Sequence, residues 1–321
     1  MAEDSIEKKA EKKRHSLMVD ALIRLVKTKP LGTAGGIITL ILLIVGIFAK
    51  FIAPYGMNAT GAGPLLAPPS IHFWLGTDNL GRDLLSRIIY GAQISVIVGL
   101  VGSALSVLVS TIIGILSGYI GGAFDMVMQR IVDAFMCIPS LIIMMLIVSI
   151  VGPGLWPVII ILGITSGIYG SRIVRSATMS IKQNVYLEAA KGIGCSPIEI
   201  LVKHILPNIT ATLIVMFSTM VPNLIIQEAS LSFLGFGVPP PAPSWGSMLT
   251  GDARKFMLQD PGLILWPGVA LSLVVYGVNM FGDALRDVLD PRLRGGVGRY
   301  GLKVNKPVVA KTQKKPAESV E

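Results

Sequence analysis

The chain has 321 residues, of which 52% are hydrophobic and 15% are charged, and its formal net charge is +9. Soluble domains carry about a quarter charged residues, so this composition, with a mean hydropathy of +0.69, excludes a soluble globular protein and indicates an integral membrane protein. The two cysteines, Cys137 and Cys195, belong to no CxxC or Cys/His cluster, which argues against a disulfide or zinc framework.

Residues 1–29 are rich in charge and predict a basic N-terminal segment. The apolar stretch that follows begins at Pro30. It is too long for the apolar part of a signal peptide and has no clear small-residue cleavage site. We therefore expect it to remain in the membrane as an anchor.

Six stretches of the chain are candidate membrane spans, because a spanning helix needs about 20 mostly apolar residues. The sequence thus predicts an all-α integral membrane protein with six transmembrane helices. The fourth stretch contains Gly163, Gly167 and Gly170, which interrupt it but also permit close helix packing. The six stretches are residues 31–53, 93–117, 131–151, 155–171, 209–229 and 263–283.

The lysines and arginines give the orientation. They concentrate in residues 1–30, in the loop 172–208 and in the tail from Asp283. The positive-inside rule places these three segments, and hence both termini, on the cytoplasmic side. Contact with anionic membrane lipid explains the basic tails, so no nucleic-acid partner is expected. Residues 291–321 are predicted to form a cytoplasmic, disordered tail.

Residues 30–91 are expected to contain the first span, an outer loop rich in proline and glycine, and an interfacial helix. Asp83 is placed to cap that helix, and Leu84, Leu85, Ile88 and Ile89 would form its apolar stripe. Ser86 and Arg87 would then face water at the membrane surface.

Residues 186–207, called the elbow below, form a polar interruption between long apolar segments. Gly192 and Gly194 can end a first short helix. Ser196 can cap a second one, with Pro197 at its first position and Glu199 at capping-box spacing. Pro207 is expected to end this second helix. An amphipathic elbow on the aqueous side of a membrane protein predicts a docking partner.

The sequence contains no phosphate loop of the G-x-x-x-x-G-K-[ST] type and no recognisable nucleophile elbow or zinc signature. We therefore expect no catalytic residues, cofactor or metal in this chain itself. Gln227 and Glu228, near the outer end of the fifth span, are polar enough to line a pathway or its gate. The alternative is that Glu228 lies at the interface and caps the next turn.

The elbow resembles the EAA loop of ABC-transporter permeases, through Glu188, Ala189, Ala190, Gly194 and the pair Leu206-Pro207, although His204 stands where the family usually has isoleucine. Residues 75–87 resemble the GTDxxGRDxxSR region of the dipeptide/oligopeptide/nickel permease family, in its C-type membrane subunit. Three further stretches agree with that family, and the resemblance covers about residues 30–295. They are Arg130 to Ser140, Glu228 to Gly246, and Trp266 to Arg292.

The resemblance implies the type I ABC importer (MetI-like) permease fold, with a five-helix core over residues 92–290, in a bacterial or archaeal cytoplasmic (inner) membrane. It implies a heterodimer with a second homologous permease, two P-loop ATPase subunits that bind ATP and Mg, and an extracytoplasmic solute-binding protein. The elbow would be the cytoplasmic coupling helix. Its docking residues would be Glu188, Ala189, Ala190, Gly194, Ile198, Leu201, Leu206 and Pro207.

Di- and oligopeptides are the solutes that the resemblance favours, and nickel or another small solute is the alternative. An ion-coupled carrier is a rival from a different class. It would need charged groups or broken helices near the membrane midplane, and the predicted spans are nearly free of Asp, Glu, Lys and Arg. A membrane scaffold without a transport role is a second rival, in which Glu188 would be dispensable.

Overall fold

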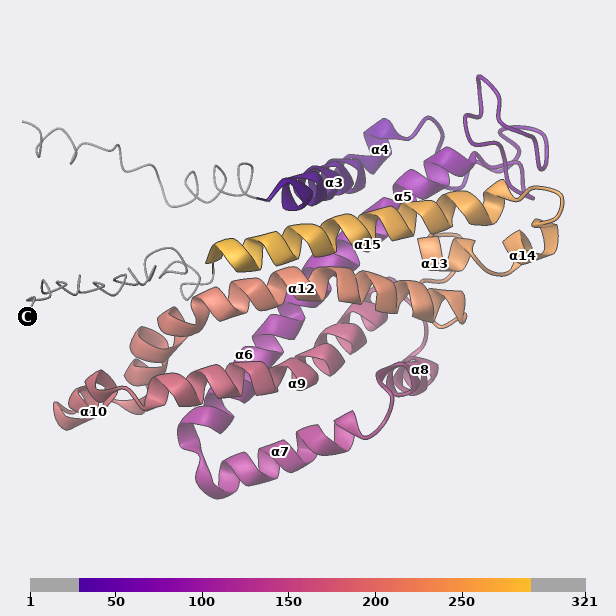
Figure 1. Cartoon of the computed structure of the whole chain (residues 1–321). Coiled ribbons are helices and arrows are strands. Elements are labelled where there is room, and N and C mark those ends of the chain that lie inside the picture. Colours follow the sequence, from indigo (N-terminus) through magenta and orange to yellow (C-terminus); the bar gives the residue numbers. More distant parts are fainter. Residues whose placement is uncertain (1–28, 290–321) are drawn as a thin grey trace, which may run out of the picture. The chain divides into compact units, whose positions relative to one another are not determined.

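A computed structural model describes residues 29–289, and apart from an isolated bridge between Thr77 and Asp83 the regular structure of these residues is helical (Figure 1). Almost all of the predicted basic N-terminal segment and the whole predicted tail lie outside the described residues.

Among the described residues, five helical stretches are long and apolar enough to cross a membrane, and there are six crossings if a bent pair counts as one. Two of the stretches contain a π-helical turn, η1 (Val98–Gly102) or η2 (Ile200–Ile205). The five are α3 (Pro30–Ile47), α5–η1–α6 (Leu84–Ile97 to Ser103–Ile120), α9 (Leu155–Lys182), α11–η2–α12 (Pro197–Glu199 to Leu206–Phe233) and α15 (Gly262–Leu289). Other short helices are α4 (Ala49–Ile52), α10 (Val185–Gly192), α13 (Trp245–Met248) and α14 (Asp252–Phe256).

The predicted third span, residues 131–151, is wrong as a single straight helix. The chain there forms α7 (Gly122–Met136) and α8 (Ser140–Val151), which meet at 88°. Pro139 lacks a backbone N–H and disfavours the helical conformation of the residue before it, so the helix breaks between Met136 and Ser140.

The interfacial helix predicted before the second span is also corrected. Asp83 does cap a helix, because its carboxylate accepts a hydrogen bond from the backbone N–H of Ser86 at 2.8 Å. That helix, however, continues without a break into the second span, so the boundary expected at residues 91 and 92 falls inside it. Ser86 and Arg87 are 1% and 9% exposed and do not face water. The outer loop covers them, and the Tyr55 N–H donates to the Ser86 hydroxyl at 3.0 Å.

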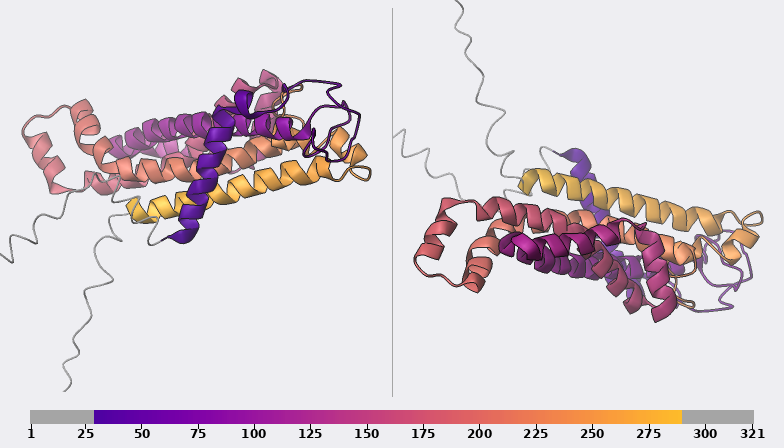
Figure 2. Two further views of the ribbon diagram at one scale, coloured as in Figure 1. Left: turned by 90° about the horizontal axis from the view of Figure 1, so that it is seen from above. Right: turned by 90° about the horizontal axis from the view of Figure 1, so that it is seen from below.

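Helices α6 and α9 pack against each other most extensively, and glycines allow their close approach. A Cβ added to Gly114 would lie 2.6 Å from the carbonyl oxygen of Ser171, and one added to Gly167 would lie 2.6 Å from Cβ of Val109. The glycine spacing that interrupts the predicted fourth span therefore serves helix packing, and α9 runs unbroken over 28 residues. Helix α3 crosses α15 obliquely (Figure 2), and a glycine allows the close approach here too, because Gly35 lies against the backbone of Gly277.

The elbow and the outer loop lie at opposite ends of the long helices. Figure 1 shows α10 at one end, and α13, α14 and the loop that precedes α5 at the other. Buried apolar side chains gather in a cluster at each end and in a third cluster around α8 and α9, as far as the chain is described. The cluster at the elbow end contains Leu187, Ile200 and Ile205 from the elbow, and Val174 and Ile209 from the spans.

Candidate functional site

The corner of the elbow is a Schellman motif at the end of α10. The Gly194 N–H donates to the Lys191 carbonyl at 3.0 Å, and the Cys195 N–H donates to the Ala190 carbonyl at 3.1 Å. Gly194 has φ +86°, a left-handed conformation that glycine adopts at little cost. Gly194 therefore turns the chain, as predicted, while Gly192 is an ordinary helical residue.

The second arm of the elbow begins as the sequence predicts and ends differently. The Ser196 hydroxyl accepts a hydrogen bond from the Glu199 N–H at 3.2 Å, which caps α11. Pro207 does not end this arm, because the helix continues through η2 into α12 and Pro207 lies in the first turn of α12. A proline ring clashes with the carbonyl four residues earlier in an α-helix, and the wider π-helical turn that precedes Pro207 gives the ring room.

One face of the elbow is anchored in the helix bundle. Leu187, Ile200 and Ile205 are at most 1% exposed and pack in the apolar cluster with α9 and α12. On the same side, Lys182 donates to the carbonyl of Tyr119 at 2.6 Å, and the ammonium of Lys191 lies 5.5 Å from the centre of the Tyr119 ring. The apolar contacts and the Lys191 contact join the elbow to α6, α9 and α12.

The opposite face of the elbow exposes apolar side chains, although the elbow itself is a polar stretch of the chain. Ile193 is 83% exposed and Ile198 is 74% exposed, and Val185, Tyr186 and Val202 are exposed beside them. Exposed apolar patches rimmed by polar residues mark interaction sites in proteins. We call Val185, Tyr186, Ile193, Ile198 and Val202 the apolar rim of the elbow.

The structure divides the predicted docking residues between these two faces. Glu188, Ala189, Gly194, Ile198 and Pro207 are exposed. Ala190 is 6% exposed, and Leu201 and Leu206 are half-buried against the elbow cluster. These last three residues therefore face the bundle instead of offering a free surface to a partner.

Sequence reasoning missed four members of the apolar rim, namely Val185, Tyr186, Ile193 and Val202. The signal in the sequence was that each is an apolar residue in a polar part of the chain, at a position outside the helix face formed by the anchoring residues Leu187, Ile200 and Ile205. It was too weak alone, because the path of the two arms around Gly194 decides which side is free.

Gln227 and Glu228, the predicted pathway residues, lie in α12. The Gln227 amide oxygen accepts from the hydroxyl of Ser166 in α9 at 3.4 Å, and Gln227 is half-buried. Glu228 is 1% exposed, and its carboxylate accepts from the Ser232 hydroxyl at 2.6 Å. Glu228 is thus enclosed within this chain, whereas Gln227 reaches its surface.

An all-helical membrane fold with a polar elbow anchored between two spans is the architecture of a multi-pass permease subunit. A family model described as "Binding-protein-dependent transport system inner membrane component" matches residues 110–295. A second, described as "N-terminal TM domain of oligopeptide transport permease C", matches residues 16–70. The chain belongs to this family of ABC-transporter permeases.

The relatives found among curated proteins are permeases as well. The oligopeptide transport system permease protein OppC of Bacillus subtilis (strain 168) is 37% identical over 286 residues, which is 89% of this chain and 93% of that protein. The glutathione transport system permease protein GsiD of Escherichia coli O6:K15:H31 (strain 536 / UPEC) is 38% identical over 257 residues, or 80% of this chain and 84% of that protein.

A solved structure shares the fold. It is a chain of the MetNI methionine ABC transporter in inward-facing conformations, with a TM-score of 0.51 and 20% sequence identity. The similarity covers 64% of this chain and 96% of that one. The expected type I importer fold is therefore confirmed.

Proposed function

We propose that this chain is the C-type permease subunit of an ATP-driven importer for di- and oligopeptides and forms half of the translocation pathway. The observation that carries the proposal is the 37% identity to an oligopeptide permease along 89% of the chain. The similarity to a glutathione permease supports a tripeptide as a second candidate solute. A second homologous permease, two P-loop ATPases and an extracytoplasmic solute-binding protein would complete the importer.

The elbow is the proposed contact with an ATPase subunit, and both chain termini are proposed to lie on the same cytoplasmic side. The exposed residues Glu188, Ala189, Gly194 and Ile198 would meet the partner, with the rest of the apolar rim around them. An amphipathic helix that lays apolar side chains into a groove is a recurrent docking mode. ATP binding can bias the spans only through contacts that differ between two states, and the anchored face of the elbow is where such contacts reach the spans.

Co-purification from the native membrane tests the assembly. The wild-type chain and a variant that combines Glu188→Arg with Gly194→Asp would be extracted in mild detergent, and bound proteins identified by mass spectrometry. We expect a second permease and P-loop ATPases with the wild type, and loss of the ATPases alone with the variant. Recovery of the wild-type chain alone, with identical behaviour of the variant, would contradict the proposal and favour an ion-coupled carrier or a scaffold.

Peptide uptake tests the solute. A strain that lacks this chain is expected to lose accumulation of radiolabelled tri-alanine, and the wild-type gene is expected to restore it. The Glu188→Arg, Gly194→Asp variant should reach the membrane without restoring uptake. Undiminished peptide uptake in the deleted strain, in a host without another peptide importer, would overturn the assignment to peptides.

A further inference from the structure

A cavity of about 430 Å³ lies at the end of the helices opposite to the elbow. Its wall combines the outer loop and the start of α5 with the segment after α12, the α13–α14 region and the start of α15. Ligand pockets in proteins measure roughly 300–1,000 Å³, so the cavity is large enough for a small solute. Neither the elbow nor the two predicted pathway residues contributes to the wall.

The cavity wall contains Asp78, Arg82, Arg87 and Asp252 as its charged side chains among the described residues. The Asp78 carboxylate is fully engaged, since Oδ1 accepts from the backbone N–H groups of Leu80 and Arg82 and Oδ2 accepts from Arg82 Nε at 2.6 Å. Asp252 is engaged as well, by the Asn79 amide at 2.9 Å and by Lys255 at 3.3 Å. Each carboxylate is thus paired with a cation other than Arg87: Arg82 for Asp78 and Lys255 for Asp252.

Arg87 is therefore the arginine of the cavity wall that has no carboxylate to itself. Its Nε lies 3.7 Å from the Asp78 carboxylate that Arg82 already holds, and its Nη1 is buried with no hydrogen-bond partner in the described part of the chain. Arg87 is only 9% exposed. A buried donor without a partner is destabilising, and more so when the group is charged. The guanidinium therefore favours an added anion beside it.

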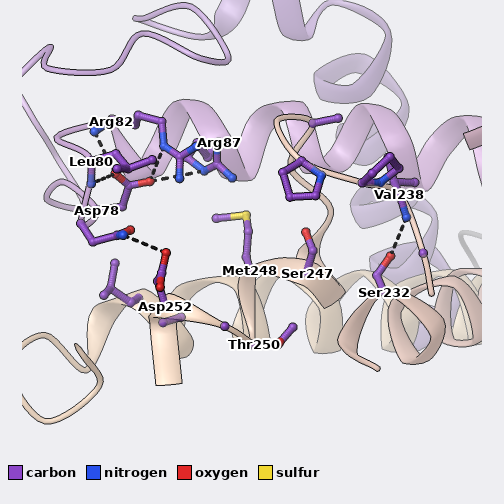
Figure 3. Close-up of a pocket in the computed structure, with 18 of the residues that line it drawn as sticks. Asp78, Leu80, Arg82, Arg87, Ser232, Val238, Ser247, Met248, Thr250 and Asp252 are labelled. Carbon is purple, nitrogen blue, oxygen red and sulfur yellow. Dashed lines mark hydrogen bonds and ion pairs between the residues drawn. The ribbon is translucent and has the colours of Figure 1, made fainter. Parts of the chain in front are cut away.

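The other walls of the cavity suit an organic ligand more than a bare ion. Met248 faces the Arg87 side of the cavity, and Ser232 and Val238 lie at its far end, as Figure 3 shows. Apolar walls with a few placed polar groups are typical of small-molecule sites, and methionine adapts to ligands of different shape. The cavity thus pairs one fixed cation with tolerant apolar walls.

We propose that this cavity binds the carboxylate end of the transported solute and that Arg87 is its anchoring residue. The identity of the ligand rests on the proposed function, because every unmodified peptide carries a terminal carboxylate while its side chains vary. The guanidinium fork matches a carboxylate with two parallel hydrogen bonds. Such a site accepts peptides of many sequences and selects for a free carboxyl terminus.

Ligand binding by the complete importer, purified without its solute-binding protein, tests the site directly. Thermal unfolding of the wild-type complex would be followed against tri-alanine and against tri-alanine amide, since a ligand that binds the folded state raises the unfolding temperature. We expect the free acid to bind at least about tenfold more tightly than the amide, a difference equivalent to about 1.4 kcal/mol. Arg87→Gln should abolish this preference, and Arg87→Lys should keep part of it.

Two further variants separate the site from general effects. Arg254→Gln removes an arginine that is exposed at the same end of the protein and lies outside the cavity wall, so it should keep the wild-type preference. Thr250→Trp fills the cavity from the α13–α14 link without changing a charge and should abolish the preference, which keeps the test decisive if Arg87→Gln does not assemble. Equal binding of acid and amide by the wild type would overturn the proposal. So would a wild-type preference retained by Thr250→Trp, or by Arg87→Gln if it assembles.

Uptake by the reconstituted importer separates this site from the proposed function. With the same solute-binding protein throughout, the ratio of uptake rates for acid and amide should fall about tenfold from wild type to Arg87→Gln, as the loss of about 1.4 kcal/mol predicts. Binding through Arg87 without any peptide uptake would refute the peptide importer and leave the carboxylate site standing. Peptide uptake with an unchanged ratio would refute the site alone.

Discussion

Arg175 holds Asp125 through two nitrogens of its guanidinium and so connects α9 to α7. Arg175 Nε donates to Asp125 Oδ1 at 2.6 Å, Nη2 donates to Oδ2, and the Ser117 hydroxyl of α6 donates to the same carboxylate. The two charged side chains are 27% and 16% exposed. Three helices therefore meet at one carboxylate, close to the end that carries the elbow.

Removal of Arg175 is expected to destabilise the protein, because it leaves a mostly buried carboxylate without its cation. Arg175→Met should lower the free energy of unfolding by about 1–3 kcal/mol, and the double variant with Asp125→Asn should lose less than the sum of the single variants. Thermal unfolding in detergent measures both effects. The control is Arg130→Met, because Arg130 is 80% exposed and lies 3.6 Å from Asp133, so its loss should cost less than about 1 kcal/mol. Equal losses for Arg175 and Arg130 would contradict this account.

Residues 83–87 carry a sequence pattern from which one inference was right and another was wrong. The pattern at residues 83–87 predicted the cap at Asp83, because capping depends on neighbouring residues alone. It placed Ser86 and Arg87 in water, because a polar residue beside an apolar stripe is usually solvated. The burial of Ser86 depends on Tyr55, 31 residues earlier, whose N–H donates to the Ser86 hydroxyl. Arg87 lies beside Asp78 in a cavity wall that it shares with the α13–α14 region, and the local pattern does not report this.

At the scale of the elements, the elbow shows how one backbone conformation sets the direction of a helix. Gly194 at φ +86° has no atom within 4 Å of an added Cβ, so a side chain there would meet backbone strain and no steric clash. Gly192 also has open space but an ordinary φ. The two glycines form a matched pair for a test of the corner.

Gly194→Ala should loosen the corner, because a left-handed conformation costs an L-residue roughly 1–2 kcal/mol. Amide hydrogen exchange over residues 185–195 is expected to accelerate about fivefold or more, since local opening becomes easier by that free energy. Gly192→Ala should leave exchange unchanged or slow it, because alanine favours the helix by about 1 kcal/mol. If both variants accelerate exchange equally, the strain at Gly194 is not the cause.

Proline has opposite effects in α7–α8, where the helix is broken, and in α11–η2–α12, where the helix is continuous. Pro139 stands where two helices meet at 88°, whereas Pro207 follows a π-helical turn inside a continuous helix. Sequence rules treat both prolines as helix breakers. The π-helical turn before Pro207 accommodates the proline ring and lets the helix continue, and no such turn precedes Pro139.

At the scale of the whole molecule, close packing of α6 on α9 connects the elbow end to the outer end. Gly114 touches the α9 backbone so closely that an added Cβ would lie 2.6 Å from the Ser171 carbonyl oxygen and 2.8 Å from the Arg175 nitrogen. Both of these atoms belong to backbone, which cannot swing aside as a side chain can. The two helices must therefore separate to admit any side chain at this position.

Gly114→Ala is accordingly expected to destabilise the protein by about 1–3 kcal/mol, the usual cost of overpacking a well-packed site. The variant should show a lower unfolding temperature and weaker recovery of the assembled importer. Gly268→Ala in α15 is the matched control, because the nearest atom to its added Cβ is a Leu249 side-chain carbon at 3.8 Å. A Gly114→Ala protein as stable as Gly268→Ala would show that α6 and α9 adjust freely.

The amino-acid sequence was sufficient to predict the membrane class, the approximate position of five of the spans, the corner at Gly194 and the permease family. These features depend on composition, on apolar run length and on short local motifs, all of which are properties of neighbouring residues. Contacts between distant segments, in contrast, bury Arg87, turn Ala190 towards the bundle and enclose a cavity between the outer loop and α13 and α14. Each of these depends on which distant segments meet, and the free energy of such contacts is not encoded in any single stretch of the chain.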